Sequence, residues 1–317
     1  MLSKKYKIGV DLGGTNVKVA LVDKNGKIVY TNSEPTRAEL GYQYVISNIK
    51  QVIYASLKET DISKDAVGGI GIGCPGQIDS VNGIVRKLPN LPGWVNIPLA
   101  QIMEEEFSLP TKLDNDVRCA TLGEYNFGAG KGATNLICIT VGTGIGSGII
   151  LNGQLIRGAS MSAGEIGHMT LEDCNGPICG CGNTGCLESL ASGPAIVQMA
   201  EDYIRGGKSS KFVELSGNTP LSAQTISEAA KSGDSVAQTI FYVTGRWIGI
   251  ALSSVVNLLN PEIIIIGGGV AQAGDLLFDP IRETIRKRAL RIAYEAVKIV
   301  PAELGESAGV IGASLLV

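Results

Sequence analysis

The stretch IGVDLGGTNVKVALVD, residues 8–23, has the layout of a β-hairpin: an apolar strand, a glycine-rich turn and a second apolar strand. A second stretch, ICITVGTGIGSGIILNG at residues 137–153, repeats this layout further along the chain. Two parts of one chain that each open on strand, glycine turn and strand indicate a duplicated fold. We therefore expect two halves with a cleft between them.

Around these hairpins, apolar strands alternate with segments in which apolar residues recur at helical spacing. Further strand patterns occur at residues 27–32, 68–76, 261–269 and 296–302. Residues 43–59 have a helical pattern, and residues 225–260 are typical of a short helix followed by a long buried one. This alternation predicts an α/β protein with mixed or parallel sheets.

A change of composition near residues 114–134 marks the expected domain boundary. We expect a small α/β domain at residues 1–115 and a large α/β domain at residues 116–303. A small-residue helix at about residues 304–317 is expected to pack back on the small domain.

The composition is that of a globular protein, with 44% hydrophobic and 18% charged residues among 317. A net charge of −3 argues against a nucleic-acid-binding surface. We find neither a signal peptide nor an uninterrupted apolar span, and expect a cytoplasmic protein. The odd number of cysteines, seven, argues against a disulfide framework. Cys74, Cys119 and Cys138 lie in apolar surroundings and are predicted to be buried.

The two glycine turns suit phosphate binding, although the Walker pattern GxxxxGK[ST] is absent. Backbone N–H groups of a tight turn form an anion nest, and Thr15 and Thr143 add hydroxyl donors. Asp11 would repel phosphate, so its expected role is to hold Mg²⁺, through water. Either turn alone can be an ordinary hairpin, but the matched pair favours an ATP site. The run IIIIGGGVAQAGD (263–275) adds a strand that ends in three glycines, where an adenine–ribose unit can approach closely.

The single histidine and three cysteines form the pattern H-x10-C-x-C-x4-C, with His168, Cys179, Cys181 and Cys186. Four such ligands suit tetrahedral Zn²⁺, and a closed set of four makes the ion structural. Cys174 is a rival ligand that would leave His168 free.

If zinc takes the only histidine, the general base of a kinase has to be a carboxylate. The stretch LDNDVRCATLGE (113–124) offers Asp114, Asn115 and Asp116 on a predicted strand-to-helix turn. Asp116 and Asn115 can grip adjacent sugar hydroxyls, with Asp116 accepting the proton. A helix N-cap is the alternative role for these residues.

Several of these motifs together resemble a known family. DLGGTN (11–16), TVGTGIGSG (140–148) and the triple glycine resemble the motifs of the sugar-kinase/Hsp70/actin superfamily. Further motifs resemble the ROK family of sugar kinases and sugar-responsive repressors: CPGQID (74–79), the Asp-Asn-Asp stretch, GEIGH (164–168) and CGCGNTGCLE (179–188). Within that family the chain looks most like the bacterial-type glucokinases.

The resemblance implies a two-lobed actin-like ATPase (ribonuclease H-like) fold with a duplicated mixed-sheet core. It implies ATP-dependent phosphorylation of a hexose, glucose by preference, at the 6-hydroxyl. The implied cofactors are ATP, Mg²⁺ and structural Zn²⁺. The implied assembly is a homodimer or a dimer of dimers. From the net charge and the lack of a long apolar span we expect neither nucleic acid nor membrane as partner.

The resemblance also assigns residues to roles. Asp116 is the catalytic base and Asn115 a sugar contact; the family usually has Glu where Asp114 stands. The sugar is further held by Gly76, Asn90, Glu165, His168 and Glu188. The nucleotide is held by Asp11, Gly13, Gly14, Thr15, Asn16, Lys18, Gly142, Thr143, Gly144, Gly267, Gly268 and Gly269. The zinc ligands include the histidine, and Cys174 is not one of them.

Three other functions stay open at this point. Another ROK kinase, for fructose, N-acetylmannosamine or allose, would carry the same motifs. A ROK repressor is expected to have about 80 residues of helix-turn-helix domain ahead of IGVDLGG, where seven residues stand here. An actin-like filament protein would share the nucleotide motifs but has no need of glutamates beside a zinc site.

Overall fold

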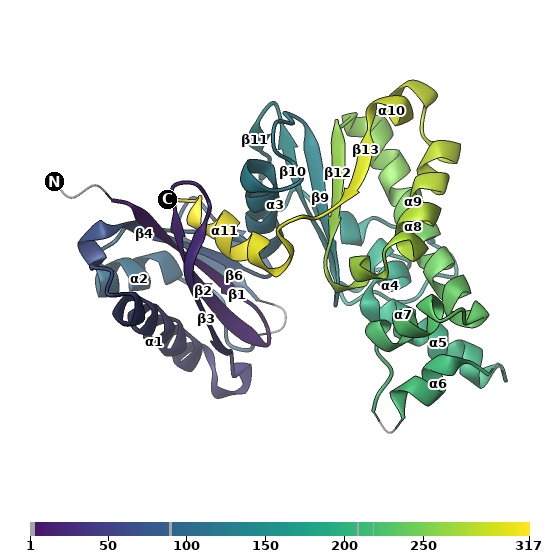
Figure 1. The fold of residues 1–317 in the computed structure, drawn as a ribbon, viewed down its shortest axis with the longest axis horizontal. Helices are drawn as coiled ribbons and strands as arrows, with labels where there is room; N and C mark the ends of the chain where they lie inside the picture. The colour runs from purple at the N-terminus through teal and green to yellow at the C-terminus, as the bar shows by residue number, and fades with distance from the viewer. Residues whose placement is uncertain (1–3, 89–90, 208, 218) are drawn as a thin grey trace. The chain divides into compact units, whose positions relative to one another are not determined.

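The computed structural model describes residues 4–88, 91–207, 209–217 and 219–317 (Figure 1). The chain forms two compact units. Unit 1 comprises Met1–Gly132, Leu155–Ala163 and Glu303–Val317, and unit 2 comprises Ala133–Gln154 and Gly164–Ala302. Residues 116–132 and 155–163, which the sequence suggested for the large domain, thus lie in unit 1.

Unit 1 is built on a five-stranded mixed sheet with the order β3-β2-β1-β4-β8. The first hairpin is antiparallel, and β4 and β8 add on in parallel. The strands are β1 (Tyr6–Leu12), β2 (Asn16–Asp23), β3 (Ile28–Pro35), β4 (Val67–Cys74) and β8 (Thr111–Asn115). A smaller sheet contains β5 (Gln77–Asp79), β6 (Ile84–Lys87) and β7 (Val95–Ile97).

The helices of unit 1 are α1 (Tyr42–Thr60), α2 (Leu99–Phe107), α3 (Asp116–Phe127) and α11 (Ala308–Ser314). The last of them, α11, packs on β1 and β4 although it is far from them in sequence (Figure 1). Glycines allow this close approach. A Cβ atom on Gly9 would lie 1.8 Å from the Val310 carbonyl oxygen, and one on Gly71 would lie 1.7 Å from that of Ala313.

Unit 2 repeats the plan of unit 1. Its sheet has the order β11-β10-β9-β12-β13, with β9 and β10 antiparallel and β12 and β13 added in parallel. The strands are β9 (Leu136–Val141), β10 (Ile145–Leu151), β11 (Gln154–Leu155), β12 (Ile263–Gly267) and β13 (Lys298–Pro301). In both sheets the first strand in sequence is central, the next two strands lie in order on one side of it, and two later strands lie on its other side. The predicted duplication is therefore confirmed.

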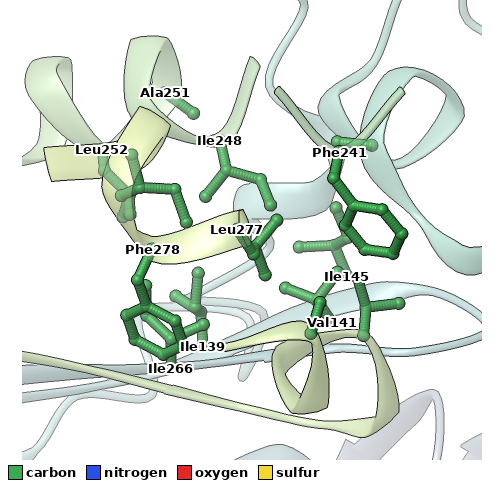
Figure 2. Close-up of a cluster of buried hydrophobic side chains, with 14 of the residues drawn as sticks. Ile139, Val141, Ile145, Phe241, Ile248, Ala251, Leu252, Ile266, Leu277 and Phe278 are labelled. Carbon is green, nitrogen blue, oxygen red and sulfur yellow. The ribbon is translucent and has the colours of Figure 1, made fainter. Parts of the chain in front are cut away.

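The helices of unit 2 are α4 (Leu187–Ala191), α5 (Gly193–Arg205), α6 (Lys211–Ser216), α7 (Ala223–Lys231), α8 (Ser235–Leu259), α9 (Asp275–Arg288) and α10 (Arg291–Ala296). Helices α8 and α9 pack tightly because Gly245 and Gly249 have no side chains to hold them apart. Figure 2 shows Phe241, Ile248 and Leu252 of α8 and Leu277 and Phe278 of α9 in one apolar cluster with Ile139, Val141, Ile145 and Ile266 of the sheet.

Helix α8 is long and apolar enough to cross a membrane. However, 61% of its most apolar window is buried inside the protein, as in the core helix of a globular unit. The predicted pair of a short helix followed by a long buried one corresponds to α7 and α8.

Candidate active site and metal centre

The first glycine turn joins β1 to β2 and is closed by hydrogen bonds within unit 1. The Gly13 N–H donates to the Asn16 carbonyl at 2.9 Å. Buried Thr36 donates its hydroxyl to the Gly13 carbonyl and its N–H to the Thr15 carbonyl, each at 2.7 Å. A Cβ on Gly14 would meet nothing within 4 Å, so the space at the tip of the turn is open.

Asp11, near the end of β1, has surroundings that disfavour its ionised form. Helix α11 lies against it: a Cβ atom on Gly309 would come within 2.6 Å of Asp11 Oδ2. Burial, and after it the negative charge of Asp116, raise the pKa of Asp11 to about 6, while Lys18, its partner across the hairpin, acts in the opposite direction. Lys18 also donates to the Glu306 carbonyl at 3.1 Å. A cation bound beside Asp11 would relieve this cost, as the expected Mg²⁺ role requires.

The predicted strand-to-helix turn is present: β8 ends at Asn115 and α3 begins at Asp116. Asn115 is the N-cap, and its Oδ1 accepts from the N–H groups of Val117 and Arg118 at 3.0 and 3.2 Å. Oδ1 of Asp116 also accepts from the Val117 N–H, at 2.9 Å. The capping role therefore holds for Asn115, and its amide nitrogen remains the atom that can contact a sugar.

Asp114 is a buried structural carboxylate, with none of its surface exposed. It forms salt bridges to Arg118 at 3.1 Å and to Arg157 at 2.7 Å, and it accepts from the Asn115 N–H at 2.8 Å. Buried Arg118 in turn donates to the Met161 carbonyl at 2.8 Å. Sequence reasoning missed both arginines: Asp114 ends a strand and Arg118 lies in the helix that follows, so their four-residue spacing is not a helix-face pattern.

Of two further expected sugar contacts, the structure describes Gly76, which follows β4 by two residues. Gly76 has a φ of +84°, which glycine adopts readily and other residues rarely. Asn90 lies outside the described residues. Trp94 is 1% exposed and packs edge-on against Tyr42, so it belongs to the core of unit 1.

In unit 2, the side chains of His168, Cys179, Cys181 and Cys186 converge, with ligand atoms within 4.8 Å of one another. Cys181 Sγ and Cys186 Sγ are 3.7 Å apart, and Cys179 Sγ is 3.7 Å from His168 Nδ1. Thiolates at about 2.3 Å from a tetrahedral Zn²⁺ would be about 3.8 Å apart, whereas a disulfide would bring the sulfurs to about 2.0 Å. The donor set and its spacing therefore fit Zn²⁺, and exposed Cys174 lies outside the group.

The loop around these ligands is shaped by glycine and by short-range pairing. Gly182 and Gly185 have φ values of +94° and +66°. The Cys179 N–H donates to the Asn183 carbonyl at 2.7 Å. Without metal, the Asn183 N–H lowers the pKa of Cys181 to about 7, whereas burial raises that of Cys186 to about 12. A bound cation would replace these thiol protons.

The two expected sugar-binding glutamates flank the metal ligands. Glu165 is exposed, and its carboxylate lies 4.0 Å from His168 Nε2. Glu188 lies in the first turn of α4, directly after Cys186 and Leu187, and its Oε2 accepts from the Ile145 N–H at 2.8 Å. Glu188 therefore contacts the second glycine turn, which sequence reasoning did not foresee.

The second glycine turn, residues 142–144, joins β9 to β10. The Gly142 N–H donates to the Gly144 carbonyl at 2.9 Å, and the Gly142 carbonyl accepts from the Gly193 N–H at 2.7 Å. The predicted adenosine glycines lie at the end of β12: Gly267 is its last residue, and Gly268 and Gly269 follow. A Cβ on Gly268 would lie 2.3 Å from the Val141 carbonyl oxygen, so the fold itself requires glycine there, while the space beside Gly269 is open.

The structure thus places the predicted residues in two groups. Unit 1 holds the first glycine turn, Asp11, Asn115 and Asp116. Unit 2 holds the second glycine turn, the triple glycine, the metal ligands and both flanking glutamates. Cys74, Cys119 and Cys138 are buried, as predicted.

Comparison with known proteins extends this picture. The model of the ROK family matches residues 7–317. The chain is 38% identical to a glucokinase of Halalkalibacterium halodurans, over 100% of this chain and 96% of the relative. It is 32% identical to the xylose repressor of Caldicellulosiruptor bescii, over 98% of this chain and 77% of the repressor.

Among solved structures, a ROK family glucokinase from Streptomyces griseus, in complex with glucose and AMPPNP, matches with a TM-score of 0.85 and 35% identity. That match covers 98% of each chain. The expected fold class, a two-lobed actin-like ATPase fold with a duplicated mixed-sheet core, is confirmed.

Proposed function

The chain belongs to the ROK family, and on that premise we propose that it is a glucokinase, which transfers the γ-phosphoryl group of ATP to the 6-hydroxyl of glucose. The supporting relatives are glucokinases similar over the full chain, one of them solved with glucose and an ATP analogue. Within the structure, the proposal rests on two carboxylates of unit 1, Asp11 and Asp116, which lie near enough for the charge of Asp116 to raise the pKa of Asp11. One carboxylate suits a metal–nucleotide and the other suits a reacting hydroxyl.

In the proposed reaction, Asp116 accepts the proton of the sugar's 6-hydroxyl as its oxygen attacks the γ-phosphorus of ATP. The bond from oxygen to the γ-phosphorus forms, the bond from that phosphorus to the β-phosphate oxygen breaks, and ADP leaves. The carboxylate base is required because the chain's one histidine lies among three cysteines. Asn115 would hold a neighbouring sugar hydroxyl through its amide nitrogen.

The remaining predicted residues would hold the two substrates. The first glycine turn with Thr15, Asn16 and Lys18, and the second with Thr143, would bind the phosphates, and the triple glycine would face the adenosine. Mg²⁺ bound near Asp11 would neutralise phosphate charge. Glu165, His168 and Glu188, with Gly76 and Asn90, would contact the sugar.

Structural zinc at His168 and the three cysteines would hold the two glutamates in place. We expect a cytoplasmic enzyme that forms a homodimer or a dimer of dimers and binds neither nucleic acid nor membrane.

Two alternatives have support of their own. Another ROK sugar kinase, acting on fructose, N-acetylmannosamine or allose, would share every motif described above. A sugar sensor without catalysis is favoured by the similarity to a xylose repressor over 98% of this chain. Sugar preference distinguishes another ROK kinase from a glucokinase, and the lack of turnover distinguishes a sensor.

The first experiment couples ADP release to a panel of sugars with Mg·ATP: glucose, mannose, fructose, allose, N-acetylglucosamine and N-acetylmannosamine. Turnover with glucose preferred supports the proposal, preference for another sugar replaces the substrate, and sugar binding without turnover identifies a sensor.

The matched variant is Asp116→Asn, which is expected to lower kcat by about 10²–10⁴-fold, the usual contribution of a general base. Its sugar affinity should remain within a few-fold of wild type. Near-normal kcat in Asp116→Asn would remove this residue from the role of base.

A further inference from the structure

Ile145 is the first residue after the second glycine turn, and its backbone is held from two sides. Its N–H donates to Glu188 Oε2 at 2.8 Å. On the other side, a Cβ atom on Gly167 would lie 2.1 Å from the Ile145 carbonyl oxygen, so the two backbones are in direct contact. Residue 144 is also in contact, because a Cβ on Gly144 would lie 2.5 Å from the same carboxylate oxygen.

The two segments that contact Ile145, around Gly167 and around Glu188, also carry ligands of the metal cluster. Gly167 directly precedes His168, and Glu188 follows Cys186 by two residues. Cys186 is fully buried and stands at the N-cap position of α4, whose first turn carries Glu188. Because His168 and the cysteines converge, the positions of Gly167 and Glu188, which contact Ile145 from two sides, are fixed relative to each other.

We propose that Glu188 is a positioning residue for the nucleotide: it transmits the rigidity of the metal cluster to the turn at residues 142–144. This inference rests on the proposed function, in which that turn binds ATP phosphates. A phosphate-binding turn works through N–H groups that keep a fixed direction, and a charged acceptor at its end restrains that direction. Among the hydrogen bonds of the residues that the structure describes, Glu188 accepts through Oε2, so Oε1 could contact the sugar and one carboxylate would serve both substrates.

The test measures binding of AMPPNP with Mg²⁺ by titration calorimetry in the absence of sugar. Glu188→Ala removes the acceptor of the Ile145 N–H and should weaken AMPPNP binding about tenfold, the effect of losing a hydrogen bond to a charged group. Glu188→Gln keeps an oxygen that can accept from the Ile145 N–H, so its AMPPNP affinity should stay within about threefold of wild type. A small loss is expected because a neutral oxygen accepts a weaker hydrogen bond than a carboxylate does.

Glu165→Ala is the matched control, because Glu165 also flanks the metal cluster and is an expected sugar contact but has no contact with the turn among the hydrogen bonds of the described residues. It should weaken sugar binding and leave AMPPNP binding unchanged. Chelation of the metal from wild type should weaken AMPPNP binding as Glu188→Ala does.

A Glu188→Ala protein that binds AMPPNP as tightly as wild type and Glu165→Ala would overturn the inference while the proposed function stands. A Glu188→Gln protein as weak as Glu188→Ala would also overturn it, since the hydrogen bond would then not be the cause. If folded wild type does not bind AMPPNP at all, the inference fails together with the proposed nucleotide site.

Discussion

Replacing Asp11 by asparagine should stabilise the folded protein at neutral pH while abolishing activity. Burial of Asp11, and secondarily the charge of Asp116, raise its pKa from 3.8 to about 6. The shift is about two pH units, which corresponds to about 3 kcal/mol by which the ionised carboxylate opposes folding. Asparagine has nearly the same shape and carries no charge, so it removes that penalty.

The sign of the pH dependence follows from the raised pKa. Below pH 3.8 the carboxyl is protonated in both the folded and the unfolded state and costs nothing. Between pH 3.8 and 6 the unfolded state has lost this proton while the folded state keeps it, so wild type loses stability as the pH rises across this range, and the loss is complete once the folded state also ionises. The free-energy advantage of Asp11→Asn should therefore be absent near pH 4, grow between pH 4 and 6, and level off above pH 7.

The assay is urea unfolding of wild type and Asp11→Asn at pH 4.5, 6 and 8, without nucleotide. Asp79→Asn is the control with the opposite sign, because N–H groups of Asn82 and then Arg86 lower the pKa of Asp79 to about 2. Asp79→Asn should destabilise the protein at pH 8. An Asp11→Asn protein that is less stable than wild type at pH 8, or whose gain does not change with pH, would refute the reasoning.

Two further predictions concern the fold that supports the site. Chelation of the metal should lower the melting temperature of the protein by about 3 °C or more, equivalent to a loss of about 2 kcal/mol for a chain of 317 residues. Cys181→Ser should reproduce part of that loss, and an unchanged melting curve would show that the cluster holds no structural ion. Gly71→Ala should destabilise the protein by about 2 kcal/mol or more, because the new Cβ and the Ala313 carbonyl oxygen, 1.7 Å apart, have to separate by about 1.5 Å. Gly206→Ala, with ordinary contacts at 3.4 Å, is its control in urea unfolding, and equal stability of the two variants would contradict the prediction.

Much of the fold could be predicted from local sequence patterns. Each hairpin was readable because strand residues and turn glycines are contiguous, and the metal ligands were readable because few other side chains combine histidine with closely spaced cysteines. The turn at Asn115 was predicted for the same reason: cap residues follow a strand and precede a helical pattern within a few positions.

Contacts between distant segments could not be read in this way. The Asp114–Arg157 pair joins residues 43 apart in sequence, and neither position belongs to a recognisable pattern of charges. Likewise, the sequence shows that Gly268 is a glycine but not that β9 approaches it closely enough to require one. The role of Glu188 at the turn was hidden because its partner is a backbone N–H, which every residue except proline provides.

The packing of α11 on β1 has a consequence for how the protein is made. Unit 1 contains the beginning of the chain, but its sheet is not covered by α11 until residues 303–317 have left the ribosome. The polypeptide passes between the units four times, so neither unit is one uninterrupted piece of chain. During synthesis, β1 therefore lacks the cover of α11 over Gly9 until all of unit 2 has been translated. A nascent chain arrested before residue 303 would carry an incomplete first unit, and β1 would be among the last strands to reach its final surroundings.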